Sequence, residues 1–486
     1  MKLSKRILAV LTALMIATVF SLSALAEGSN GNPPEGMPGG GSAPSEPPEG
    51  GPGDGEFPGE PPEGGMPGNP PEGGMPGGGS SDFEYAAATE ITGETGEADG
   101  VYASTESDVS AVIVNTDADV VLDNPTVEKT GDSNGGDSCN FYGLNAAVLV
   151  MGGATATING GTVTSDADGA NGVFCYGGNG AQNGGEGDGT TVYISDTTIA
   201  TTGDGSGGIM TTGGGVTYAS NLTVETSGRS SAAIRTDRGG GTVVVNGGSY
   251  TSNGLGSPAI YSTADITVTG ATLTSNLSEG VCIEGLNAIT LNDCDLTANN
   301  TQMNGNATFL DTIMIYQSMS GDADSGTSLF TMNGGSLTSR SGHMFHVTNT
   351  NAVISLNGVT LTNEDGENVL ISVCDDGWNG DNNTATLNAS AQALSGAILV
   401  GDNSALTLNL TDGATLEGYV GGEITNAKGE TVSTEVGSVS VSLDETSSWT
   451  LTGDSYITEF NGDPANVHSN GYTLYVGGVA LEGVSA

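Results

Sequence analysis

Basic and aromatic residues are scarce in this chain. Its 486 residues hold 9 lysines and arginines against 57 aspartates and glutamates, a formal net charge of −48, and aromatic residues make up 5% of the total. Three of the nine cations, Lys2, Lys5 and Arg6, lie in the first six positions. Because so acidic a surface repels polyanions, the composition excludes nucleic-acid binding and favours solubility and the binding of cations.

Cysteines are also few. Their odd number leaves at least one thiol unpaired within the chain, and no Cys-x-x-Cys spacing indicates zinc. We expect small buried spacers, since cysteine packs as a small apolar residue. A disulfide between Cys282 and Cys294 is the alternative. The five cysteines are Cys139, Cys175, Cys282, Cys294 and Cys374.

Long hydrophobic runs are missing beyond the N-terminus. Residues 1–26 have a basic start, an apolar run from Ile7 to about Leu22 and the small-x-small triplet Ala-Leu-Ala at 24–26, the pattern of a secretory signal peptide. No later stretch is apolar and long enough to span a bilayer. We therefore expect a secreted protein, extracellular or associated with the cell surface, without membrane insertion.

Residues 27–82 are of low complexity, with the octapeptide PPEGGMPG at 61–68 and again at 70–77. Glycine does not recur at every third position, which excludes collagen. With few groups to bury, the segment cannot offset its chain entropy, so we predict a disordered Pro/Gly/Glu linker. Residues 83–110 are expected to form an N-terminal cap region.

A repeated unit follows, in keeping with 81 glycines and many Thr, Val, Ile and Asn residues. Each unit has a short apolar strand, an Asn/Asp/Gly corner, a Thr-rich strand, a Gly/Ser turn and a strand around Ile. The corners recur at intervals of 23, 23, 41 and 24 residues, and the long interval is a unit plus an inserted loop. The aligned corners are Asn246, Thr269, Asn292, Asn333 and Asn357.

Units this short cannot bury their own apolar faces and must stack on one another. The sequence therefore predicts an all-β fold, a right-handed parallel β-helix over residues 111–486 with less regular coils from about 397. Alternation along the strands places Val and Ile inside and Thr outside. A β-sandwich is the competing architecture, but the fixed interval argues against it.

The order of strand, Asn corner, Thr-rich strand and turn resembles the secreted right-handed parallel β-helix proteins of the pectate-lyase-like superfold. It resembles most closely the adhesin-like, carbohydrate-binding β-helix group of gut and anaerobic bacteria, over about residues 110–480. The resemblance implies a polysaccharide or a host-surface glycan as the partner. It specifies no activity, because that superfold hosts lyases, hydrolases, adhesins and binders without catalysis.

One strand of each unit predicts a binding face. If the Ile or Phe of each strand points inward, the following residue points outward, and these residues form one column. Tyrosine rings would stack on sugars, and Arg235 and Arg238 would pair with acidic groups. Asp237, Glu284 and His346 would hydrogen-bond sugar hydroxyls. The column is Met210, Arg235, Tyr261, Glu284, Tyr316 and His346, with Asp237 and Arg238 beside it.

Three alternatives remain open at this point. The charged residues of the column could be a surface ion-pair patch, of the kind that contributes little stability. The chain could be a polysaccharide lyase or glycoside hydrolase, although the Asp-Asp pair at 375–376 follows Gly342-His343 instead of preceding it, as polygalacturonase-like proteins would require. It could also be a structural surface protein. We expect a monomer and assign no catalytic residue.

A metal site is suggested by residues 374–383, CDDGWNGDNN, where Asp375, Asp376 and Asp381 could bind Ca²⁺ through carboxylate oxygens. The spacing completes no established calcium-loop motif, so a solvated acidic loop is the alternative.

Overall fold

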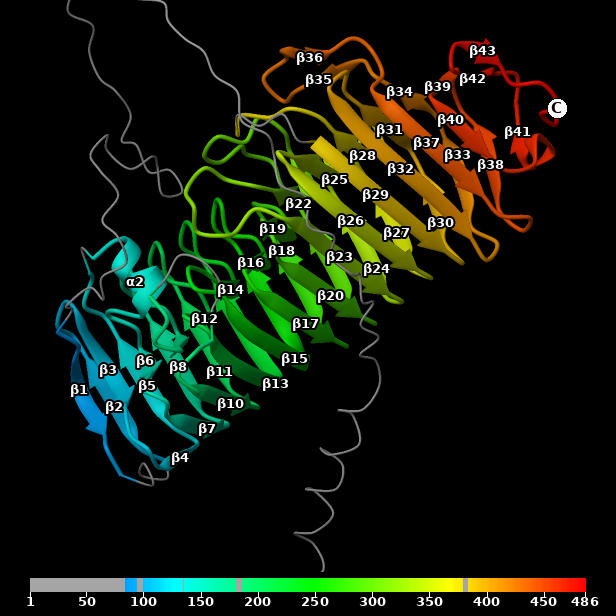
Figure 1. Cartoon of the computed structure of the whole chain (residues 1–486). Helices are drawn as coiled ribbons and strands as arrows, with labels where there is room; N and C mark the ends of the chain where they lie inside the picture. Colours follow the sequence, from blue (N-terminus) through cyan, green and yellow to red (C-terminus); the bar gives the residue numbers. More distant parts are fainter. Residues whose placement is uncertain (1–83, 94–98, 134, 181–185, 379–382) are drawn as a thin grey trace, which may run out of the picture. The chain divides into compact units, whose positions relative to one another are not determined.

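The structure is a computed structural model that describes residues 84–93, 99–133, 135–180, 186–378 and 383–486. The predicted signal peptide and linker lie outside these residues. Within them, no helix is long and apolar enough to cross a membrane. Two large sheets of parallel strands dominate the fold (Figure 1).

The first sheet, called sheet A here, takes one strand from each turn of the chain. Its 13 strands, in spatial order, are β1 (Ala86–Ile91), β3 (Val109–Val114), β6 (Val148–Val150), β9 (Val173–Tyr176), β12 (Ile209–Thr212), β14 (Ile234–Thr236), β16 (Ile260–Ser262), β19 (Val281–Glu284), β22 (Asp311–Tyr316), β25 (His343–Thr348), β28 (Val369–Val373), β31 (Ala397–Val400) and β34 (Val420–Gly421).

The second sheet, sheet B, takes the remaining strands of most turns. Its 21 strands, in chain order, are β2 (Val101–Ser104), β4 (Asp119–Asp123), β5 (Thr126–Lys129), β7 (Thr155–Asn159), β8 (Thr162–Ser165), β10 (Thr191–Ser195), β11 (Thr198–Thr201), β13 (Gly215–Thr226), β15 (Gly241–Ser252), β17 (Asp265–Thr269), β18 (Thr272–Ser275), β20 (Ala288–Asn292), β21 (Asp295–Ala298), β23 (Thr327–Asn333), β24 (Ser336–Ser339), β26 (Thr350–Asn357), β27 (Thr360–Asn363), β29 (Asn383–Ser390), β32 (Ser404–Thr411), β37 (Ser438–Leu443) and β40 (Glu459–Asn461).

Smaller elements complete the described chain. The only antiparallel pairings among the described strands are β35–β36 and β42–β43. The elements are the helix α2 (Asp137–Tyr142), the 3₁₀ turn η1 (Pro464–Asn466), a four-stranded sheet of β30 (Ala393–Ser395), β33 (Thr415–Gly418), β38 (Ser448–Leu451) and β41 (Val467–His468), the hairpin of β35 (Ile424–Thr425) and β36 (Thr431–Ser433), and a three-stranded sheet of β39 (Ser455–Ile457), β42 (Leu474–Val476) and β43 (Val479–Ala480).

The prediction of stacked parallel turns is confirmed, and the arrangement is compatible with a parallel β-helix. Every predicted corner lies opposite the next in the strand register: Asn246 opposite Thr269, Thr269 opposite Asn292, Asn292 opposite Asn333, and Asn333 opposite Asn357. Asn333 Nδ2 donates to Asn292 Oδ1 at 2.9 Å, so side-chain amides bridge successive turns there.

The core is one continuous apolar column inside the stack. In β15 and β17 the alternate residues Val243, Val245, Ile266 and Val268 are buried, and Thr267 between the last two is half-buried on the outside. Burial of each such side chain contributes about 1.5–3 kcal/mol, and every added turn extends the same core.

A serine ladder stabilises one inner corner of the stack. Ser206 N donates to Ser231 Oγ at 2.9 Å, and Ser231 N donates to Ser257 Oγ at 2.8 Å. The turn is also tight: a Cβ added to Gly228 would lie 1.8 Å from Gly203 O. Only glycine permits the backbones of neighbouring turns to approach so closely at this corner.

The outer face of sheet A is largely covered by inserted segments. Helix α2 lies over β12, where Thr212 Oγ1 donates to Phe141 O at 2.7 Å. Further along the stack, Met314 and Cys282 pack beneath Ala307 and Trp378. Ile424 of the β35–β36 hairpin belongs to a third cluster, beside Leu399. The sheet therefore has a second, discontinuous layer on its outside, and its polar outward residues lie under or between these covers.

Candidate functional site

The strand register confirms part of the predicted column and corrects the rest. Arg235 lies opposite Met210 on one side and Tyr261 on the other, as predicted. Tyr261, however, lies opposite Cys282 and not Glu284. His346 lies opposite Met314 and not Tyr316, while Glu284 and Tyr316 lie opposite each other in the neighbouring outward column.

The two errors have one physical cause. β19 has the inward-facing residues Val281 and Ile283, and either can be aligned with Ile260 of the preceding strand. β22 has the inward-facing residues Ile313 and Ile315, and either can be aligned with Phe345 of the following strand. A slip of two residues keeps every side chain on its own face, because strand side chains alternate with period two. The face was therefore predicted correctly, and two of the predicted neighbour pairs, Tyr261 with Glu284 and Tyr316 with His346, were wrong.

Glu284 is the centre of a buried hydroxyl cluster. Its Oε2 accepts from the hydroxyls of Tyr261 at 2.6 Å and Tyr316 at 3.3 Å, and its Oε1 accepts from Ser318 and Ser320. Burial raises the pKa of Glu284, and the hydroxyl donors oppose this shift. The cluster fixes the segment 317–326 on the sheet and orients Tyr261, which keeps partial exposure. Tyr316 is buried beneath the ring of Trp378.

Arg235 is the centre of a second polar cluster. Its Nη2 lies 2.8 Å from Asp237 Oδ2, and its Nη1 donates to Ser230 O at 2.8 Å and Asn140 Oδ1 at 3.2 Å. The guanidinium carbon lies 5.7 Å from the centroid of the Tyr261 ring. Only 8% of Arg235 is exposed, so its charge acts in a medium where a partner matters far more than at an open surface.

Arg238 joins the covers on either side of this cluster. Its Nε and Nη2 both donate to Asp322 Oδ1, at 3.0 and 2.6 Å, and its guanidinium lies 4.1 Å from the centroid of the Phe141 ring. Helix α2 and the segment 317–326 are thereby linked through one side chain. Arg229 makes a similar link on the neighbouring corner, donating to Asn304 Oδ1 at 3.1 Å.

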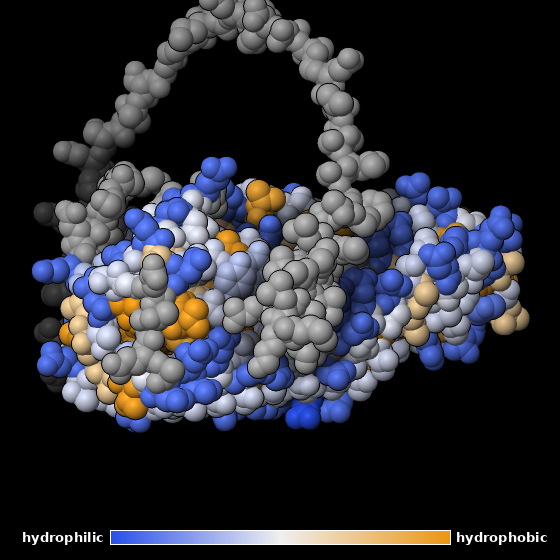
Figure 2. All heavy atoms as spheres, turned by 90° about the horizontal axis from the view of Figure 1, so that it is seen from below, coloured by the Kyte–Doolittle hydropathy of each residue, from blue (hydrophilic) through white to orange (hydrophobic). Residues whose placement is uncertain are grey.

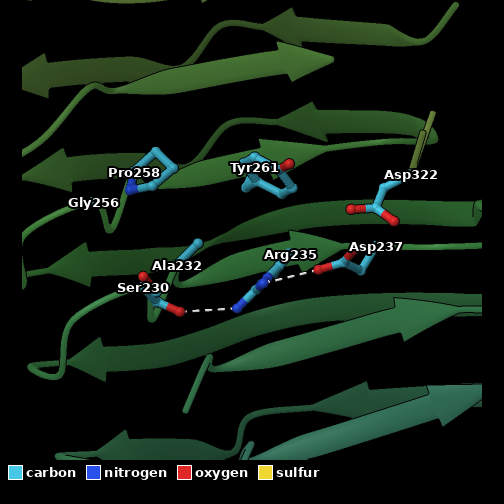
Figure 3. A pocket seen from close by; sticks show the side chains of 8 residues that line it. All are labelled: Ser230, Ala232, Arg235, Asp237, Gly256, Pro258, Tyr261 and Asp322. Atoms are coloured by element: carbon cyan, nitrogen blue, oxygen red, sulfur yellow. Dashed lines mark hydrogen bonds and ion pairs between the residues drawn. The ribbon is translucent and has the colours of Figure 1, made fainter. Parts of the chain in front are cut away.

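A small cavity of about 30 Å³ opens beside Asp322 of the segment 317–326, with Arg235 and Asp237 at its centre and Tyr261 above them (Figure 3). The space is large enough for a water molecule or a carboxyl group and too small for a sugar ring. Its lining residues are Ser230, Ala232, Arg235, Asp237, Gly256, Pro258, Tyr261 and Asp322.

Asp237 is a buried carboxyl group of this cavity whose pKa is shifted towards neutral pH. Burial raises its pKa to about 7, Arg235 opposes the shift, and the charge of Asp322 adds to it. Burial likewise raises the pKa of Asp137, at the start of α2. Asp237 therefore exchanges a proton near neutral pH while it lies in direct contact with a permanent cation.

His346 belongs to a different, sealed cluster. Its Nδ1 lies 2.8 Å from Ser372 Oγ, which also lies 2.7 Å from His343 Nδ1, and its Nε2 lies 3.4 Å from Asp376 Oδ2. Phe309 stacks on the His346 ring at 4.5 Å, and neither Ser372 nor His346 is exposed. The contacts from Asp376 through His346 to Ser372 resemble the connectivity of a hydrolase catalytic triad. The Ser372 hydroxyl is fully buried, however, so a ligand cannot reach it.

Asp376 is a structural anchor in this cluster. Its Oδ1 accepts from both the amide and the hydroxyl of Thr308, at 2.6 Å each. Burial tends to raise its pKa, yet the hydrogen bonds and the His346 ring outweigh burial and hold the pKa below its ordinary value. Burial lowers the pKa of His343 to about 3.

The structure describes only two of the three predicted calcium ligands. Asp376 is occupied as above, Asp375 Oδ1 accepts from Asn383 Nδ2, and Asp381 lies outside the described residues. Among the residues that the structure describes, no group of three or more His, Cys, Asp or Glu side chains could hold a metal ion.

All five cysteines are free and buried, in agreement with the expected small spacers. Cys282 lies outside sheet A beneath Trp378, whereas Cys294 lies in the central core, so the two thiols are on opposite sides of the β structure.

Two exposed tyrosines on sheet B form another aromatic feature. Tyr193 and Tyr218 stack at 5.1 Å between ring centroids with an interplanar angle of 9°, and they are 44% and 41% exposed. Each ring covers one face of the other, which leaves less ring face for a sugar than an isolated ring would offer. Elsewhere, the surface seen in Figure 2 is mainly hydrophilic, with small hydrophobic patches.

Sequence reasoning missed the residues that the covers bring to Arg235 and Arg238. Asn140 and Phe141 come from α2, and Asp322 from the segment 317–326. The Phe-Tyr pair at 141–142 was a usable signal in a chain with 5% aromatic residues, whereas Asp322 is one of many acids in Gly/Ser-rich segments. No protein-family model, curated protein or solved structure matches the chain.

Proposed function

We propose that this protein is a secreted, extracellular or surface-associated, adhesin-like β-helix protein that binds a polysaccharide or host-surface glycan without catalysis. The binding site is the cavity of Arg235, Asp237 and Tyr261 on the outer face of sheet A, with Arg238 at its edge. The observation that carries the proposal is the concentration of cations. Three arginines, Arg229, Arg235 and Arg238, lie in a stretch of ten residues, although the net charge of the chain is −48.

The fold does not require a cation at this place. The same outward column carries Met210 before Arg235 and Cys282 and Met314 after Tyr261, all of them buried beneath covers. Removing an arginine from water is expensive, and its ion pair with Asp237 offsets this only in part. Because apolar residues fill the neighbouring positions of the column, the buried charge of Arg235 supports a role in binding.

Some residues of the site would contact the glycan, and others hold the contacting residues in place. Tyr261 offers a half-buried ring to a sugar face, and Arg235 and Arg238 offer charge to acidic groups. Glu284 supports the site from below by fixing Tyr261, and Tyr316 completes that cluster. His346 lies with Asp376 and contributes to the fold of the neighbouring cover, so it is outside the proposed contact set.

The proposal is tested by a glycan array probed with the secreted protein and two arginine variants. Arg340 is the matched control, because it is an exposed arginine whose 3.8 Å ion pair with Glu364 lies outside the cavity. We expect acidic glycans to retain the wild type and Arg340→Gln, and Arg235→Gln to bind at least tenfold more weakly. Reducing-sugar release and unsaturated uronide absorbance should stay at background.

Three results would contradict the proposal. Binding to no glycan by the folded wild type would remove the function, and equal binding by Arg235→Gln and Arg340→Gln would remove the site. Release of sugar that Arg235→Gln abolishes would show an enzyme instead.

A further inference from the structure

We infer that the Arg235 cavity is a proton-coupled carboxylate site: it admits one carboxylate group as the partner of Arg235 when Asp237 is protonated. The inference rests on the proposed function and adds the chemical group that the site selects and the condition under which it binds.

The size of the cavity defines what can enter. About 30 Å³ beside Arg235 accommodates one small planar group and excludes a sugar ring. A pendant carboxylate of an acidic sugar can enter while the ring stays outside, against Tyr261. The guanidinium fork matches that group in shape and charge.

Two neutral acceptors hold the Arg235 guanidinium in place without cancelling its charge. Ser230 O and Asn140 Oδ1 accept from its Nη1 and fix its plane, and Asp237 alone is an anion in contact with it. Asp237 therefore competes with any incoming carboxylate. Protonation of Asp237 removes the competitor and leaves the guanidinium in place.

The charges around Asp237 explain why its carboxylate can take up a proton and become neutral. Its near neighbours are not all compensating: Asp322 lies beside it in the cavity wall (Figure 3), while Arg238 is engaged with Asp322. Burial raises the pKa of Asp237 to about 7 in spite of Arg235. The other titratable groups that act on this cluster are Tyr261 and Glu284, from the sheet, and Asp137, from α2.

A cation is the less suitable ligand for the same space. Arg235 lines the cavity and repels it, and Asp322 already accepts two hydrogen bonds from Arg238. An incoming carboxylate instead replaces the negative charge that Arg235 loses from its side when Asp237 is protonated. Binding of the anion and uptake of the proton are therefore linked.

The linkage fixes the pH dependence. Above pH 7 each pH unit should weaken binding about tenfold, because one proton must be taken up for each carboxylate bound. Below pH 7 the affinity should reach a plateau, and it should fall again near pH 4, where the ligand carboxylate itself becomes protonated.

Titration calorimetry of the full chain with sodium acetate tests this directly, with acetamide as the uncharged control. At pH 7, runs in buffers of different ionisation enthalpy should show uptake of about half a proton per acetate. Acetate should bind at least tenfold more tightly at pH 6 than at pH 8.5. Asp237→Asn should bind with little pH dependence, and Arg235→Gln should not bind.

Each outcome separates the inference from the proposed function. Acetate binding without proton uptake, or with equal affinity at pH 6 and 8.5, would overturn the inference, and so would binding by Arg235→Gln. No acetate binding alongside Arg235-dependent retention of neutral glycans would overturn the carboxylate site and leave the glycan function standing. Proton-coupled acetate binding without any glycan retention would do the reverse.

Discussion

Tyr261 and Glu284 lie on neighbouring strands of sheet A but two positions out of register, and the Tyr261 hydroxyl crosses this offset to donate to Glu284 Oε2 at 2.6 Å. The pair joins two outward columns. Through it, the cover formed by residues 317–326 is connected to the ring that lies above Arg235. The shape of the cavity therefore depends on a carboxyl group that does not line it.

Replacing Glu284 by Ala should loosen that cover. The change leaves the hydroxyls of Tyr261, Tyr316 and Ser318 without their acceptor, and we expect a loss of about 1–3 kcal/mol in the free energy of unfolding. Urea unfolding measures it, with the exposed Glu423→Ala as the control. Equal stability of the two variants would show that the cluster does not fix the cover.

Stability should fall as the pH rises from about 5 to 8. Burial raises the pKa of Asp237 to about 7 and raises the pKa values of Glu279, Glu284 and Asp311, so the folded state binds more protons than the unfolded state between the ordinary and the raised values. Stability from these groups is present in mild acid and is lost as they ionise. Urea midpoints at pH 5.5, 7 and 8 test the direction.

Asp311→Asn separates this effect from the repulsion of surface charge. The variant cannot ionise at a fully buried position, so its stability should decline less steeply between pH 5.5 and 8 than that of the wild type. Parallel curves for the two proteins would assign the whole pH dependence to the net charge. The lowered pKa of Asp376 works in the opposite direction, but only near its ordinary value of 3.8 and below.

The serine ladder should contribute measurably to the stacking of turns. Ser231→Ala removes the acceptor for Ser206 N and the donor to Gly203 O, all within a buried corner. We expect about 1–3 kcal/mol of destabilisation. Ser220→Ala, an exposed position on the neighbouring turn, is the control and should change the free energy of unfolding by less than about 0.5 kcal/mol.

The five cysteine thiols should not react with thiol reagents in the native protein. All are buried and free, and burial raises the pKa of the Cys175 thiol to about 12. A thiol reagent should label none of them at pH 8 and all five in denaturant. Fewer than five in denaturant without reductant would reveal a disulfide that the structure does not contain.

The fold could be predicted because its strongest signal is periodic. Corners such as Asn246 and Asn292 recur once per turn, and the register confirms their alignment residue by residue. The strands of sheet A carry a weaker signal. With Val281 and Ile283 both inward, sequence could fix the face of Glu284 but not its neighbour, since period-two alternation is unchanged by a slip of two residues.

The candidate site could be predicted only in part, because its walls come from insertions. Arg235, Asp237 and Tyr261 lie in the repeat and were placed together correctly. Asp322 reaches the same cavity, and Phe141 contacts Arg238 beside it, from segments without periodicity, so nothing in the repeat indicates their position. Inserted segments also bury Glu284, beneath residues 317–326, and His346, beneath Phe309, which the pattern alone would leave at the surface.

Hydrogen–deuterium exchange with and without the best array glycan, at pH 6, tests the central claim most directly. The account predicts slower exchange in residues 229–240, 256–262 and 317–326, which surround the Arg235 cavity. Protection should be absent in Arg235→Gln and present in Arg340→Gln. Protection confined to sheet B around Tyr193 and Tyr218, with no change near Arg235, would contradict the account.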